Sequence, residues 1–133
     1  MSQENVELVR KTMEAFSAGD QDSVFDLATT DFTFDVSRTD LEGGVHTGRA
    51  AILEFLSNWV STWEDHTVEP VEFIDAGGDH VVVVLHEQGR IKGIDTWVEH
   101  VRGVVYTVCD GKVARYDEYM DRAQALEAVG FSG

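Results

Sequence analysis

The second half of the chain consists of extended segments joined by short turns, and this pattern restricts the fold more than any other feature. Residues 66–93, HTVEPVEFIDAGGDHVVVVLHEQGRIKG, hold two extended segments separated by a Gly-Gly-Asp turn. Residues 96–109 predict a third long strand, and residues 112–120 predict a returning strand after the turn dipeptide Asp110-Gly111. Strands joined by such short turns pair antiparallel, so we expect an antiparallel sheet in this half.

The first half has helical periodicity instead. Within residues 4–18 the apolar side chains recur at the spacing of an amphipathic helix, and Gly19 ends the run. Asp20 is the expected N-cap of a second, shorter helix over residues 21–28. Residues 32–36 alternate in polarity and predict a short strand.

A third helix is predicted from Arg49 onward, after a loop rich in turn residues. Its apolar face is formed by Ile52, Phe55, Leu56, Trp59 and Trp63. Asp121 is the expected cap of a last short helix over residues 122–130. The order of elements predicts one α+β domain over residues 1–133, in which helices pack on one face of a curved, mainly antiparallel sheet.

Charge and cysteine content exclude several classes of partner. The chain has 25 Asp and Glu against 10 Lys and Arg, a net charge of −15. This balance disfavours nucleic acid and anionic membrane surfaces, which both need clustered basic residues. Cys109 is the single cysteine, so no internal disulfide is expected, and a cytoplasmic location is the simplest interpretation. The five histidines form no HExxH motif and no phosphate-binding glycine loop occurs, so we predict no metal and no cofactor.

Three strings of the sequence resemble a known superfamily. Residues 15–35, AFSAGDQDSVFDLATTDFTFD, are similar to the opening of the nuclear transport factor 2-like fold, which includes ketosteroid isomerases and SnoaL-like polyketide cyclases. Residues 47–59, TGRAAILEFLSNW, resemble its third helix, and residues 110–130, DGKVARYDEYMDRAQALEAVG, resemble the closing hairpin and tail of SnoaL-like proteins. The resemblance implies a cone in which the curved sheet wraps round the helices and an apolar pocket opens at one end.

Strand alternation, combined with this resemblance, predicts which side chains face the pocket. Three sets point inward, namely Tyr116, Glu118 and Met120; His100, Arg102, Val104, Tyr106 and Val108; and Val81, Val83, Leu85 and Glu87. Val82, Val84 and His86 are left on the outer face, whose apolar character would suit a homodimer interface.

The resembling enzymes imply several sets of catalytic residues. Ketosteroid isomerases have a carboxylate base at the position of Asp35, but their two oxyanion donors fall on Thr12 and about Val104, so one position of three is kept. In epoxide hydrolases of this fold, a catalytic carboxylate falls on Glu118. SnoaL-like cyclases imply an acid/base pair, which Glu118 or Asp35 would form with His100 if they face each other across the cone.

These comparisons define the candidate site. The candidate catalytic residues are Asp35, Glu118, His100 and Tyr116. The candidate substrate-binding residues are Phe16, Phe55, Trp59, Trp63, Glu87, Tyr106 and Met120.

Each candidate also has a structural interpretation. Asp35 would order the loop that follows it, and Glu118 would pair with Arg102 or His100 across the strands. The tryptophans would only pack in the core. Arg38 and Arg90 would either guard the pocket mouth against a ligand carboxylate or pair with some of the many acids.

The function predicted for the chain is cofactor-free acid/base chemistry on a small, mostly apolar organic molecule, of the isomerase, cyclase or hydratase/hydrolase type. The alternative is a ligand-binding or assembly module of the same fold without chemistry, because this fold carries many unrelated functions.

Overall fold

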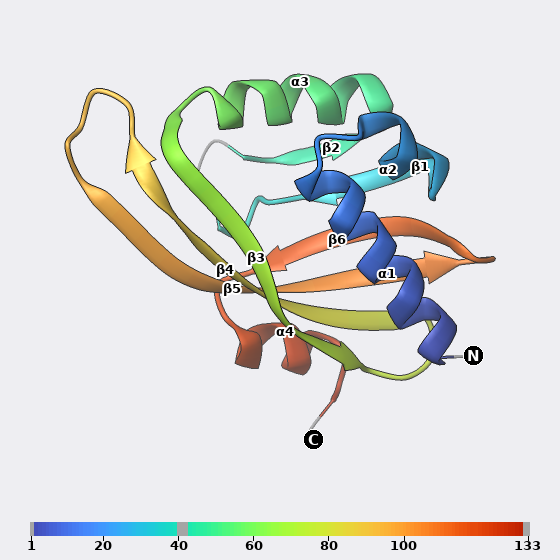
Figure 1. Ribbon diagram of the computed structural model, residues 1–133. Helices are drawn as coiled ribbons and strands as arrows, with labels where there is room; N and C mark the ends of the chain where they lie inside the picture. The colour runs from blue at the N-terminus through green and yellow to red at the C-terminus, as the bar shows by residue number, and fades with distance from the viewer. Residues whose placement is uncertain (1, 40–42, 132–133) are drawn as a thin grey trace.

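A computed structural model describes residues 2–39 and 43–131. Four helices and six strands follow in the order α1 Ser2–Ser17, α2 Gln21–Asp26, β1 Ala28–Asp35, β2 Val45–Thr47, α3 Arg49–Val60, β3 Trp63–Asp75, β4 His80–Ile91, β5 Trp97–Cys109, β6 Lys112–Tyr119 and α4 Arg122–Ala128. The strands form one sheet in the order β2-β1-β6-β5-β4-β3 (Figure 1). Only the β1–β6 pairing is parallel, so the predicted α+β fold with a mainly antiparallel sheet is confirmed.

The predicted helix caps are present. The side chain of Asp20 accepts a hydrogen bond from the backbone N–H of Ser23 at 3.2 Å, at the start of α2. Asp121 does the same for the backbone N–H of Gln124 at 2.8 Å, at the start of α4. Each carboxylate satisfies a backbone donor that has no partner within its helix, which fixes where the helix begins.

Several predicted boundaries were wrong. α3 ends at Val60, and Trp63 begins β3 instead of closing the helix. The loop before α3 contains the short strand β2, which pairs with the end of β1. β6 ends at Tyr119, so Met120 lies beyond the strand and does not continue its alternation. Strand ends depend on pairing with a neighbour, and no pattern within one segment records that pairing.

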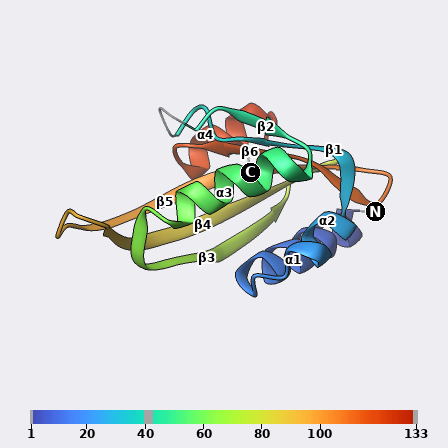
Figure 2. The same ribbon diagram turned by 90° about the horizontal axis from the view of Figure 1, so that it is seen from above.

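The sheet separates two apolar layers. On its inner face, Val9 and Met13 of α1 and Ile52 of α3 pack with side chains from β1, β4, β5 and β6. Seen from above, α3 lies across the sheet, with α1 and α2 beside it (Figure 2). On the outer face, Ala125 and Leu126 of α4 pack against strand residues of β4 and β5. The helices of the first half thus form one wall of the interior, and α4 closes part of the other side.

The predicted alternation of β4 and β5 is confirmed by this division. The inner layer contains Val81, Val83, Leu85, Val104, Tyr106 and Val108. Val82 belongs to the outer layer, but α4 covers it together with Val105. Val101, which is 46% exposed, remains uncovered on β5. A homodimer formed through the outer face therefore stays a prediction. Its interface would have to use the part of that face that α4 does not cover.

Gly103 is where β5 and α4 approach each other most closely. A Cβ atom at this position would lie 2.5 Å from the backbone oxygen of Asp121 and 2.8 Å from Cβ of Ala125. Both neighbours are fixed parts of α4 and its cap, so they cannot move without displacing the helix.

We therefore expect Gly103→Ala to lower the free energy of unfolding by about 1–3 kcal/mol through overpacking. Urea titration followed by circular dichroism measures the change. Val101→Ala is the control, because it alters an exposed side chain on the same strand. Equal stability of Gly103→Ala and the parent chain would contradict the close docking of α4.

Candidate active site

The concave side of the sheet encloses a cavity of about 720 Å³. Its wall is contributed by all three N-terminal helices and by strands β1, β3, β4, β5 and β6. Most of the surface is apolar or aromatic. Nine of the predicted site residues lie on this wall, namely Phe16, Phe55, Trp59, Trp63, Glu87, His100, Tyr106, Tyr116 and Glu118.

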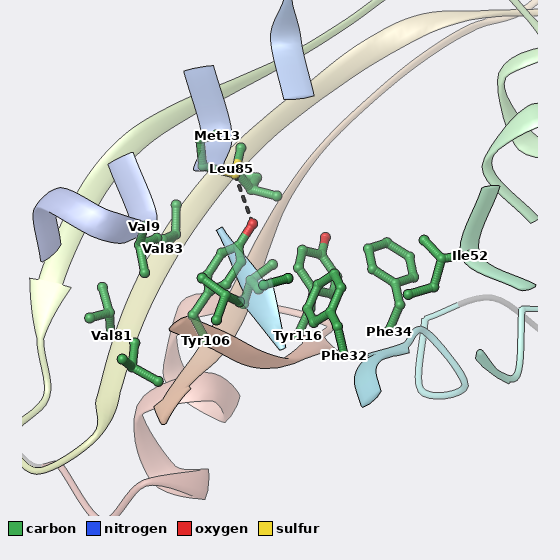
Figure 3. Packing of buried hydrophobic residues seen from close by; sticks show 14 of the residues in the cluster. Val9, Met13, Phe32, Phe34, Ile52, Val81, Val83, Leu85, Tyr106 and Tyr116 are labelled. Carbon is green, nitrogen blue, oxygen red and sulfur yellow. Dashed lines mark hydrogen bonds between the residues drawn. The ribbon is translucent and has the colours of Figure 1, made fainter. Parts of the chain in front are cut away.

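Two buried tyrosines contribute hydroxyl groups to the wall. The rings of Tyr106 and Tyr116 meet edge to face with centroids 5.3 Å apart, and Tyr116 stacks on Phe34 at 4.2 Å (Figure 3). The hydroxyl of Tyr106 donates to the sulfur of Met13 at 2.9 Å. Burial, and then the nearby charge of Glu118, raises the pKa of both tyrosines, so both hydroxyls stay protonated at neutral pH.

Glu118 places a carboxylate in this apolar surrounding. Its Oε1 accepts a hydrogen bond from the hydroxyl of Tyr116 at 2.8 Å, and its Oε2 accepts one from the hydroxyl of Thr39. Both donors are neutral, and no ion pair to Glu118 occurs within the described residues. The predicted pairing of Glu118 with Arg102 or His100 is therefore not what the structure shows. Two fixed donors hold the carboxylate in one orientation while its charge remains uncompensated by a cation.

A second polar cluster joins β3, β4 and β5. One oxygen of the Glu87 carboxylate accepts a hydrogen bond from Nε2–H of His66 at 2.8 Å, and the other oxygen accepts one from Nε2–H of His100. The side chain of Glu87 is 12% exposed and that of His100 is 25% exposed. Glu87 and His100 line the cavity. One carboxylate thus orients two imidazoles, and one of these faces the cavity.

His66 was missed by the sequence reasoning because a bulge in β3 determines its direction. The register between β3 and β4 shifts between Glu64 and Thr67, and Asp65 has a left-handed φ of 52°. The bulge lets both Trp63 and His66 turn inward, where their rings stack at 4.5 Å.

The sequence signal that could have predicted the inward direction of His66 is Gly89, on the neighbouring strand β4. A Cβ atom on Gly89 would come within 3.0 Å of both Trp63 and His66. A glycine inside a strand indicates a close approach of this kind.

The structure places Asp35 outside the cavity, which corrects its prediction as a pocket base. Phe32 and Phe34 of β1 point inward, so Asp35 points to the opposite face, where it lies beside Asp117 of the parallel strand β6. Arg115 and Arg38 bind it there, at 3.3 and 3.4 Å. Asp35 instead orders the loop after β1, the structural alternative expected from the sequence.

The pKa of Asp35 reflects this ion-pair cluster. Burial by itself raises the pKa, but hydrogen bonds from the hydroxyl and backbone N–H of Ser37 and the charges of Arg38 and Arg115 outweigh it. The pKa of Asp35 consequently lies below its ordinary value. The ionised carboxylate is therefore a stabilising part of the fold.

Met120 is the second predicted residue that the cavity does not include. It is 44% exposed and lies past the end of β6. Its backbone oxygen accepts a hydrogen bond at 3.3 Å from Arg102, which does line the cavity. Arg38 and Arg90 form ion pairs with aspartates away from the cavity, as the structural alternative predicted.

The match to a family model decides the relationship of this chain to known proteins. A SnoaL-like domain model matches residues 9–116. The chain belongs to the SnoaL-like family. Comparison with curated proteins gives no match.

Several solved structures of other proteins have the same fold as this SnoaL-like domain. A nuclear transport factor 2-like protein from Burkholderia xenovorans LB400 is 28% identical with a TM-score of 0.77, and 96% of this chain covers 97% of that one. TerC, co-crystallised with polyporic acid, is 23% identical with a TM-score of 0.75, at 95% and 98% coverage. A ketosteroid isomerase-like protein from Catenulispora acidiphila, in complex with trimethylamine, is 20% identical with a TM-score of 0.70, at 95% and 94% coverage.

Two further properties concern the described residues alone. No helix within residues 2–39 and 43–131 is long and apolar enough to cross a membrane. In the same part of the chain, no group of three or more His, Cys, Asp or Glu side chains is arranged to hold a metal ion.

The lowered pKa of Asp35 predicts how stability depends on pH. A depressed carboxyl pKa stabilises the fold above about pH 4 and loses this effect as the pH falls through the folded-state pKa. Asp35→Asn should lower the free energy of unfolding at pH 7 by about 1–3 kcal/mol, a value reduced because the paired arginines are partly exposed.

Urea titrations at pH 7 and pH 3 measure both effects. The difference between the Asp35→Asn variant and the parent chain should shrink at pH 3, where the carboxyl group is protonated. Asp31→Asn, on the exposed part of β1, is the control. A difference that stays the same at both pH values would show that the ion pairs are not its source.

Proposed function

We propose that this SnoaL-like domain catalyses proton transfer on a small, mostly apolar organic molecule, with Glu118 as the general base. The observation that carries the proposal is a carboxylate inside an apolar cavity of about 720 Å³, oriented by two neutral donors and left without a cationic partner. Glu118 is partly buried, and placing a carboxylate there without a cationic partner costs free energy, which proteins accept mainly at functional sites. The reaction types that fit are isomerisation, cyclisation and addition of water.

Tyr116 is proposed to orient the base. Its hydroxyl is committed to Oε1 of Glu118, and its raised pKa keeps the proton on the tyrosine instead of on the carboxylate. Thr39 fixes the other oxygen. A base held in this way meets the substrate in a single orientation, which lowers the entropic part of the barrier.

His100 is the proposed orienting residue at the second polar cluster. Its Nε2–H binds Glu87, which His66 holds from the other side, so the ring orientation is fixed. His100 and Glu118 do not face each other across the cavity, because they stand on the neighbouring strands β5 and β6 of one wall. Glu118 lies opposite Val104 in the register, four residues from His100 on β5, or about 13 Å along the strand. A substrate that meets both groups would extend along this wall.

The nature of the ligand is supported by the lining and by structures of the same fold. Phe55 and Trp59 of α3 offer aromatic surface opposite the sheet, and Trp63 adds to it from the start of β3. TerC was crystallised with polyporic acid and the protein from Catenulispora acidiphila with trimethylamine, both small organic molecules. We accordingly propose that this chain also binds a small organic molecule between its helices and its sheet.

The exchange of carbon-bound hydrogen tests the proposed base. 2-Tetralone is a fused two-ring ketone with acidic hydrogens next to its carbonyl group, and proton NMR in D₂O follows their replacement. The parent chain should accelerate the exchange. Glu118→Gln should reduce this acceleration by about 100-fold or more. Tyr116→Phe should reduce it by about tenfold, because it removes a hydrogen bond to the charged base.

Glu99→Gln is the matched control, since Glu99 is an exposed carboxylate on β5 that pairs with His86 instead of lining the cavity. A thermal-shift titration with the same ketone measures binding separately. Binding without any exchange would identify the chain as a ligand-binding module without chemistry. Exchange that persists in Glu118→Gln would reject Glu118 as the base.

A further inference from the structure

Arg102 differs from every other arginine in this acidic chain. The sequence has seven arginines, and six of them form ion pairs with carboxylates, namely Arg10, Arg38, Arg49, Arg90, Arg115 and Arg122. Arg102 has no carboxylate partner within the described part of the chain, and its recorded hydrogen bond goes to the backbone oxygen of Met120 at 3.3 Å. A guanidinium carries five N–H donors, so most of the donor capacity of Arg102 is unused.

This arginine is also the only Lys or Arg on the cavity wall formed by the described residues. It stands on the inner face of β5, two residues from Val104, which pairs with Glu118, and two residues from His100, which pairs with Glu87. The unpaired cation therefore lies on the wall between the proposed base and the second polar cluster.

Arg102 and Glu118 are diagonal neighbours on adjacent strands, a geometry in which long side chains of opposite charge normally meet. They form no ion pair. Tyr116 and Thr39 hold the carboxylate, and the oxygen of Met120 holds the guanidinium. Each charge is thus fixed apart from the other, and both are available to a molecule in the cavity.

We propose that Arg102 is a further catalytic residue, which binds the oxygen that becomes negatively charged when Glu118 removes a proton from carbon. This inference rests on the proposed function and specifies its substrate as a carbonyl compound with an acidic C–H bond, such as a ketone, an ester or a 1,3-dicarbonyl. Glu118 takes the proton, the electron pair of the C–H bond forms a C–C double bond, and the carbonyl π electrons move to the oxygen. The enolate oxygen then pairs with the guanidinium of Arg102, and the proton on Glu118 is returned to carbon.

Several other donors on the wall are already committed. The hydroxyl of Thr12, at a position where resembling isomerases have an oxyanion donor, binds the backbone oxygen of Leu8 at 2.9 Å. Val104, at the other such position, has no donor. Tyr116 binds Glu118, and Tyr106 binds Met13. Arg102 is the charged donor that remains, and charge-assisted hydrogen bonds are about twice as strong as neutral ones.

The ionisation of bound 4-nitrophenol tests this role directly. Its phenolate carries charge on an oxygen attached to an sp² carbon, as an enolate does, and absorbs visible light when the neutral phenol does not. With Arg102 present, the pKa of bound 4-nitrophenol should lie about one to three units lower than in Arg102→Met. Spectrophotometric titration of the saturated complexes gives both values, and binding is measured separately with the neutral form at low pH.

Arg122→Met is the matched control, because Arg122 pairs with Glu72 outside the cavity. It should leave the titration of the bound phenol unchanged. Arg102→Lys should recover part of the shift, since it restores a positive charge. Arg102→Gln provides a second neutral variant, and circular dichroism verifies that each variant is folded. The same phenol pKa in the parent chain, Arg102→Met and Arg102→Gln would overturn the proposal.

The exchange of 2-tetralone separates the possible results. Arg102→Met should lower kcat for this neutral ketone by at least about tenfold with little change in KM, because the charge on oxygen develops only in the transition state. An effect confined to KM would overturn the catalytic role. Failure of the parent chain to bind either the phenol or the ketone would overturn the proposed function as well. Binding and exchange that are indifferent to Arg102 would overturn this inference alone.

Discussion

The alternation of side chains across β4, β5 and β6 determines which charged groups face the cavity. Each strand sends one residue into the cavity and the next to the outer face, so neighbouring acids in the sequence enter different environments. Glu118 enters the cavity and meets neutral donors. Asp117 turns outward and joins Asp35, Arg38 and Arg115 in a network of ion pairs. A slip of one residue in the register of β6 would exchange these two environments and place a different carboxylate in the cavity.

The same alternation explains how so acidic a chain maintains an apolar interior. Of its 25 acids, only Glu87 and Glu118 line the cavity formed by the described residues. Glu87 accepts hydrogen bonds from two imidazoles, those of His66 and His100. Glu118 receives only neutral donors. The two carboxylates therefore differ in their partners, and only Glu118 is proposed as a base.

The sequence predicted the fold class and most of the cavity wall, from periodicity within single segments together with the family resemblance. Strand parity grouped His100 with Tyr106 and Glu118 with Tyr116, and the family resemblance indicated that these faces point inward. Glu87 was placed by the resemblance alone, because both faces of its strand are apolar. Asp35 was misplaced because family resemblance was followed where parity argued against it. Phe32, Phe34 and Val36 alternate on one face, so Asp35 belongs to the other.

The remaining errors come from features that only pairing between strands determines. In the sequence, Met120 has the same parity as Tyr116 and Glu118, but β6 ends one residue before it. His66 faces inward because of a bulge that involves the left-handed Asp65 and the small residue Gly89 on the next strand. Neither the end of pairing nor the bulge can be derived from one segment, since each depends on a residue more than ten positions away.

These errors hid one property of the cavity, namely that the opposite charges of Glu118 and Arg102 are held apart. If Glu118 and Arg102 formed an ion pair, the carboxylate would be a weaker base and the guanidinium would have fewer free donors. Tyr116, Thr39 and the backbone oxygen of Met120 prevent that pairing at the cost of leaving two charges uncompensated. The backbone oxygen of Met120 therefore contributes to the proposed site, although the Met120 side chain lies outside the cavity. The end of β6 determines where that oxygen lies, so the length of this strand sets the distance between base and cation.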